Sequence, residues 1–127
     1  MTTAFWCVLI AALLPYVAAV VAKAGAPGFD NNAPREWLEK QEGFRARANA
    51  AQQNSFEAFG FFAVAVLVAH VSRGQQGLVD LLAMVFIAAR IVYLAVYVAG
   101  WGAVRSLVWT VGMAATVWIF LTAAIGR

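Results

Sequence analysis

The chain has 127 residues, of which 64% are hydrophobic and only 12% are charged. A soluble domain of this length carries about twice that share of charge, so the composition excludes an ordinary soluble protein and indicates an integral membrane protein. The single cysteine, Cys7, excludes an intrachain disulfide. No metal-ligand cluster, phosphate-binding loop or Ser/His/Asp set occurs in the sequence, and we expect no nucleic-acid partner.

Residues 4–22 form an uninterrupted apolar run, which matches the roughly 20 residues that a membrane-spanning helix needs. A signal peptide is the alternative, because the small residues of AKAGA are similar to a cleavage site. No lysine or arginine precedes the run, so we predict a first spanning helix over 4–22. The polar connection that follows contains helix breakers: Gly25, Pro27, Gly28 and Pro34, with DNNAP predicting a turn and REWLEKQEGF an interfacial stretch.

Three further spanning helices are predicted, over about 44–72, 78–99 and 103–125. The first of these would be roughly 43 Å long, whereas the hydrocarbon core is about 30 Å thick. Its polar N-terminal half is therefore expected to project from the lipid. We predict an all-α integral membrane protein, a bundle of four transmembrane helices that forms one domain over 1–127.

Lysine and arginine residues are divided unevenly between the two sides of such a bundle. With four spans, the connections between helices 1 and 2 and between helices 3 and 4 share one side. That side carries Lys23, Arg35, Lys40, Arg45, Arg47 and Arg105, and the other carries Arg73 and Arg127. Because cytoplasmic loops are enriched in Lys and Arg, we predict that the first side is cytoplasmic and that both termini lie outside.

Polar residues recur at helical spacing inside the predicted spans. The second helix carries one stripe, formed by Arg47, Ala50, Asn54 and Glu57, and the third carries another, formed by Arg90, Tyr93 and Tyr97. Arg105 and Ser106 lie at the start of the fourth helix, and Trp109 lies one turn deeper. Ionisable groups in a spanning helix are costly and usually face a partner or a wet cavity, so we expect a Glu57–Arg90 ion pair. Together the stripes predict a pocket near the cytoplasmic face for a small anionic ligand and a lipophilic partner.

Two other interpretations of these polar residues remain open. Polar side chains on facing membrane helices often only hold a bundle together, and a lone Glu–Arg pair is more often structural than catalytic. A small transporter with Glu57 and Arg90 as a charge relay is the other interpretation, although the helices lack the Gly/Pro-interrupted pairs typical of transporters.

The motif RAxxAxxNxxE is similar to the second-helix signature of the MAPEG family, the membrane-associated proteins of eicosanoid and glutathione metabolism. It runs here from Arg47 to Glu57, and Arg90-x-x-Tyr93-x-x-x-Tyr97 followed by Arg105-Ser106 resembles the rest of the family pattern. The DNNAPR turn looks like that of bacterial members. The resemblance covers nearly the whole chain, including its length and its four spans.

The resemblance implies a homotrimer in a bacterial inner membrane, with glutathione bound between subunits near the cytoplasmic face. It implies a glutathione-dependent transferase or peroxidase that acts on lipophilic electrophiles. Arg105 would stabilise the glutathione thiolate and Arg90 would pair within the bundle. The residues implied to bind glutathione are Asn54, Glu57, Tyr93, Tyr97, Arg105 and Ser106.

The chain also departs from the family pattern. Glutathione-using members usually carry an arginine at the position of Ala50, and some carry a basic residue at that of Gln53. Lys23 stands where some members have arginine, Trp109 stands where tyrosine is common, and the proline usual after the glutamate is absent. The alternative function is therefore a non-catalytic scaffold or lipid-binding accessory subunit that keeps the fold and binds a membrane-protein partner.

Overall fold

The structure is a computed structural model that describes residues 1–24, 28 and 32–125. The turn signals at Gly25 and Pro27 and the first residues of DNNAP lie outside the described residues. The chain forms one short and four long helices: α1 Thr3–Lys23, α2 Pro34–Glu39, α3 Phe44–Val71, α4 Gln76–Ala99 and α5 Gly102–Ile125. In the part of the chain described here, the four long helices are long and apolar enough to cross a membrane.

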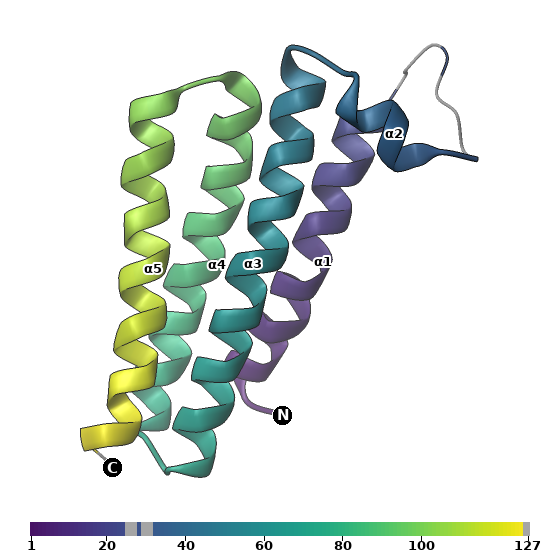
Figure 1. The fold of residues 1–127 in the computed structure, drawn as a ribbon. Helices are drawn as coiled ribbons and strands as arrows, with labels where there is room; N and C mark the ends of the chain where they lie inside the picture. The colour runs from purple at the N-terminus through teal and green to yellow at the C-terminus, as the bar shows by residue number, and fades with distance from the viewer. Residues whose placement is uncertain (25–27, 29–31, 126–127) are drawn as a thin grey trace.

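The four long helices stand side by side as an up-and-down bundle (Figure 1). Each begins and ends within two residues of its predicted range; the largest difference is at the start of α4, which lies at Gln76 rather than 78. The short helix α2 and the α4–α5 turn lie at one end of the bundle, and both termini lie at the other (Figure 1). We call the first of these the α2 end.

The helix α2 begins at Pro34, the last residue of the predicted turn, and continues into the predicted interfacial stretch; the sequence did not predict it as a separate helix. Pro34 occupies the first helical turn, where a missing N–H is tolerated. Leu38 is buried and packs in a cluster with Ala22 of α1 and Ala48 of α3. Gly43, with φ of 65°, then ends the connection and α3 begins. The apolar contacts of Leu38 hold α2 against α1 and α3.

Small residues let the helices approach closely. The main core lies between α1, α3, α4 and α5 and is rich in fully or nearly fully buried alanines: Ala4, Ala11, Ala65, Ala69, Ala83 and Ala115. Small side chains at helix contacts are the usual way in which membrane helices pack, because lipid gives no hydrophobic drive to association. The rings of Phe62 and Phe86 stack at 4.0 Å between α3 and α4.

Buried polar groups within the described parts of the spans find partners inside the protein. The buried Thr116 hydroxyl donates to the Gly112 carbonyl at 3.0 Å, and that of Thr122 donates to the Ile119 carbonyl at 2.7 Å. Among the described residues, no buried side-chain nitrogen or oxygen lacks a hydrogen bond. Water is absent from the hydrocarbon core, so this internal pairing is what a membrane-spanning bundle requires.

The α4–α5 turn is a Schellman motif, which fixes where α5 begins. Gly100 has φ of 84°, its N–H donates to the Tyr97 carbonyl, and the N–H of Trp101 donates to the Val96 carbonyl. The side chain of Arg47, on α3, donates from Nε to the remaining Val98 carbonyl at 2.9 Å. This bond ties the start of α3 to the end of α4 and satisfies a carbonyl that the helix leaves free.

The α3–α4 turn is built in the same way but places a non-glycine residue in the left-handed region. Arg73 has φ of 58°, and such a conformation costs an L-residue about 1–2 kcal/mol. We expect Arg73→Gly to raise the free energy of unfolding by roughly 0.5–1 kcal/mol, since glycine also loses more backbone entropy on folding. Denaturation in detergent measures this change.

The neighbouring Ser72→Gly is the matched control for this prediction. Ser72 has φ of −85°, so glycine relieves no strain there and stability should stay the same or fall. If Arg73→Gly lost as much stability as Ser72→Gly does, the expected gain from relieving the strain at Arg73 would be contradicted.

Candidate functional site

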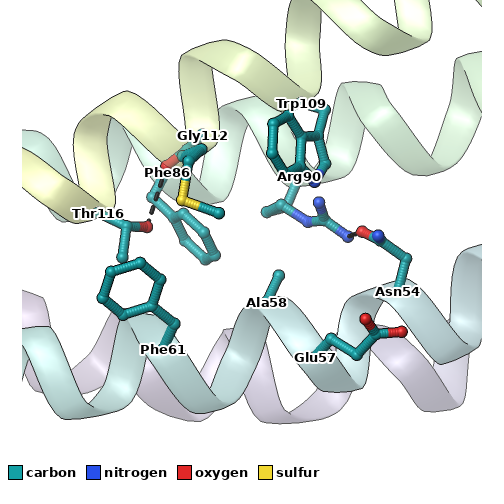
Figure 2. A pocket seen from close by; sticks show the side chains of 10 residues that line it. Asn54, Glu57, Ala58, Phe61, Phe86, Arg90, Trp109, Gly112 and Thr116 are labelled. Atoms are coloured by element: carbon teal, nitrogen blue, oxygen red, sulfur yellow. Dashed lines mark hydrogen bonds between the residues drawn. The ribbon is translucent and has the colours of Figure 1, made fainter.

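A cavity of about 140 Å³ lies between α3, α4 and α5, and we call it the inner cavity. Its walls are Asn54, Glu57, Ala58, Phe61, Phe86, Arg90, Trp109, Gly112, Met113 and Thr116. Figure 2 shows the polar groups Asn54, Glu57 and Arg90 together at one end and the rings of Phe61 and Phe86 at the other. The inner cavity therefore has a polar part and an apolar part.

Arg90 forms the centre of the polar part. Its side chain is 4% exposed, and Nη2 donates to Asn54 Oδ1 at 2.8 Å and to Ser55 Oγ at 3.3 Å. Its Cζ also lies 4.1 Å from the centroid of the Tyr93 ring. These contacts join α4 to α3 by charge-assisted hydrogen bonds and a cation–π contact.

The expected ion pair between Glu57 and Arg90 is wrong for this structure. Arg90 donates to Asn54 and Ser55, and the dashed line in Figure 2 joins it to Asn54 and not to Glu57. Glu57 is an exposed residue, whereas the guanidinium of Arg90 is buried and donates to oxygens of α3. Arg90 does pair within the bundle, with neutral oxygens.

A second, wider hollow of about 490 Å³ lies nearer the α2 end, and we call it the outer hollow. It is lined by Tyr93, Tyr97, Arg105, Ser106, Trp109 and Thr110, from the last turns of α4 and the first turns of α5. The Cζ of Arg105 lies 4.6 Å from the centroid of the Tyr97 ring. The rings of Tyr93 and Tyr97 meet edge to face, with centroids 5.4 Å apart.

Trp109 lines both the inner cavity and the outer hollow. The two spaces therefore adjoin at the indole, and all six residues predicted to bind the ligand line one or the other. Asn54 and Glu57 line the inner cavity, and the other four line the outer hollow: Tyr93, Tyr97, Arg105 and Ser106. Both predicted stripes and the start of the last helix therefore contribute to these walls, but Arg47 and Ala50 of the first stripe line neither space.

The sequence prediction omitted several residues of these walls. Trp109 was predicted one turn deeper than Arg105 on the same helix but was not counted among the ligand-binding residues, and it lines both spaces. The apolar wall formed by Phe61, Phe86 and Met113 gives no such signal, since these residues look like ordinary core residues in the sequence. Ser55, which accepts from Arg90, was also missed.

The guanidinium of Arg105 makes the outer hollow suitable for an anion. Within the described part of the chain, no carboxylate lies within ion-pair distance of Arg105, so none of these residues neutralises its charge. An unpaired guanidinium in a partly dry pocket stabilises a bound anion by charge-assisted hydrogen bonds. The adjoining apolar wall of the inner cavity then suits a lipophilic molecule.

Comparison with known proteins identifies a family for this arrangement. A sequence model of the MAPEG family matches residues 3–125. Searches of curated proteins and of solved structures each gave no match. The family match covers nearly the whole chain and all four long helices, and the chain therefore belongs to the MAPEG family.

Proposed function

We propose that the protein is a membrane-bound glutathione-dependent transferase or peroxidase that acts on lipophilic electrophiles. The family includes glutathione-dependent transferases and peroxidases. The observation that carries the proposal is the position of Arg105, whose guanidinium has no carboxylate partner among the described residues and lies in a hollow that it shares with Tyr93, Tyr97 and Ser106. These groups supply the charge and the hydroxyl donors that a thiolate needs.

The proposed role of Arg105 is to favour the thiolate form of glutathione. A free thiol has a pKa near 8.5 and is mostly protonated at neutral pH. Lowering that pKa by about two units requires roughly 2.7 kcal/mol of preferential thiolate stabilisation. A guanidinium in a partly dry pocket can supply this amount, because it stays charged and presents several donors.

Two reactions follow from a stabilised thiolate. In transfer, the sulfur attacks an electrophilic carbon, a C–S bond forms, and the leaving group departs with its electron pair. In peroxide reduction, the thiolate attacks one peroxide oxygen, the O–O bond breaks, and a proton from water gives an alcohol and a glutathione sulfenic acid. A second glutathione reduces the sulfenic acid to water and the disulfide. The protein contributes thiolate stabilisation and approximation of the two substrates.

The proposal includes an assembly and an orientation. We propose a homotrimer in a bacterial inner membrane, with the α2 end in the cytoplasm and glutathione bound between subunits. The excess of Lys and Arg at the α2 end supports this orientation. Glu57 supports a covered site, because an exposed carboxylate on a spanning helix is costly unless a ligand or another subunit meets it.

Turnover by the protein in lipid vesicles tests the proposed function. Glutathione should be consumed with an activated aryl halide or with an organic hydroperoxide, whereas S-methylglutathione, which has no thiol, should give no reaction. The consumption should depend on the protein and exceed the rate in empty vesicles. Rates equal to those of empty vesicles with both classes of electrophile would contradict an enzymatic function.

A non-catalytic function is the second candidate, and Ala50 favours it. An arginine is usual there in glutathione-using members, and Ala50 lines neither the inner cavity nor the outer hollow. In this case the fold would hold a lipid or a membrane-protein partner. Stoichiometric copurification with another membrane protein, together with absence of turnover, would favour this candidate.

A further inference from the structure

A third hollow adjoins the outer hollow at the α4–α5 turn. This turn hollow has a volume of about 290 Å³ and is lined by Arg47, Tyr97, Gly100, Trp101, Gly102 and Arg105. Tyr97 and Arg105 line both the turn hollow and the outer hollow. A ligand held in the outer hollow can therefore extend past these two side chains towards Arg47.

The backbone of the turn fixes the position of Arg47. Its Nε donates to the Val98 carbonyl at 2.9 Å, which anchors the guanidinium to the end of α4. Gly100 lies directly beneath it, since a Cβ added there would lie 3.5 Å from both Cζ and Nε of Arg47. The Nη1 and Nη2 atoms make no hydrogen bond to the described residues, so they remain available to a ligand.

The charges in the turn hollow favour an anion. Arg47 and Arg105 come from α3 and α5 and line the same space. Neither has a carboxylate of the described residues within ion-pair distance. Two like charges facing one hollow repel each other, and an oxyanion between them replaces that repulsion by two attractive contacts.

We propose that Arg47 binds a carboxylate of glutathione in the turn hollow while Arg105 stabilises the thiolate in the outer hollow. This inference rests on the proposed function. Glutathione is an elongated peptide whose thiol lies between two carboxylates, so it matches two adjoining spaces that share Arg105. Arg47 precedes Ala50 by three residues on the same face of α3 and supplies the cation that Ala50 lacks.

The test measures binding of three thiols to the purified full-length protein and its variants. The thiols are glutathione, its glycyl ethyl ester, and an analogue that lacks the γ-glutamyl carboxylate. Arg47→Met keeps most of the side-chain stem and removes the charge, so glutathione should bind roughly tenfold or more weakly. For the one analogue that lacks the bound carboxylate, the same substitution should change the dissociation constant less than about twofold.

Arg45→Met is the matched control. Arg45 also lies on the first turn of α3 and donates to a backbone carbonyl, that of Ala22, at 3.0 Å, but it does not line the turn hollow. This control should bind glutathione as the unchanged protein does. Arg47→Lys keeps the charge with fewer donors, and it should fall between the unchanged protein and Arg47→Met.

The other possible results separate the role of Arg47 from the proposed function. Unchanged glutathione binding by Arg47→Met, or an equal loss for all three thiols, would overturn the role of Arg47 and leave the proposed function standing. Absence of glutathione binding by the unchanged protein would instead overturn the proposed function itself. If Arg47→Met does not fold, equal binding of all three thiols by the unchanged protein would overturn the inference.

Discussion

Arg105→Ala is expected to reduce glutathione turnover about 25-fold at pH 7 while the helical bundle stays folded. The factor is the fall in the thiolate fraction at about pH 7 when the pKa of the bound thiol rises by about two units, from about 6.5 to about 8.5, and each unit is worth about 1.36 kcal/mol. Arg105 is half-buried at the start of α5 and contacts the Tyr97 ring, so its removal leaves the core unchanged. The measurement is steady-state turnover together with ultraviolet absorbance of the bound thiolate.

The pH dependence separates this role from a structural one. In the unchanged protein the thiolate should form well below the pKa of free glutathione, so the rate should level off near neutral pH. In Arg105→Ala the bound thiol loses its cation, so the rate should keep rising about tenfold per pH unit until about pH 8.5. Arg105→Lys should recover part of the effect, and a pH profile of Arg105→Ala identical to that of the unchanged protein would contradict the assignment.

Arg90→Ala is expected to give the largest loss of stability, about 3 kcal/mol or more. The substitution removes the hydrogen bonds to Asn54 and Ser55 and the contact with Tyr93. Hydrogen bonds to charged groups contribute about 1.5–3 kcal/mol each, and the removed side chain would enlarge a cavity that already exists. Thermal unfolding in detergent measures the loss, as a lower midpoint temperature.

Arg35→Ala is the control for this prediction. Arg35 is exposed on α2, where a surface substitution usually changes stability by less than about 0.5 kcal/mol. If Arg90→Ala unfolded at the same temperature as Arg35→Ala, the contacts of Arg90 would not hold α3 and α4 together as described.

The four spans were predictable because each is a long apolar run bounded by polar or glycine-containing turns. The lengths of these apolar runs predict the number of spanning helices, and the predicted ends lie within two residues of the ends in the structure. The separate α2 was not predictable in the same way. Its six residues carry too few apolar positions to show a period, and its existence depends on the tertiary contact of Leu38 with Ala22 and Ala48.

The sequence predicts on which face of its helix each candidate site residue lies, but it does not predict the depth of that residue along the bundle. The spacing of Asn54 and Glu57 on one helix and of Tyr93 and Tyr97 on the next placed these residues around adjoining hollows. It could not fix the relative height of two helices. A displacement of one turn, about 5.4 Å, changes which oxygens a side chain meets, and Arg90 meets Asn54 and Ser55 instead of Glu57.

The role of Arg47 required the turn geometry as well. The sequence places Arg47 on the polar face of α3, but it does not show that α4 ends beside it. The left-handed Gly100 and the free Val98 carbonyl together hold the guanidinium of Arg47 in place. Because Arg47 and Val98 are 51 positions apart, no local sequence pattern reveals this contact.

Equilibrium binding of glutathione to the detergent-solubilised protein is the most direct test of the central claim. The account predicts binding at millimolar or tighter affinity, with the bound thiol present as thiolate at neutral pH. It also predicts that Arg105→Ala loses the thiolate signal. Absence of binding at several times the cellular glutathione concentration would contradict the account, and the hollows would then have to hold a lipid or face a partner protein.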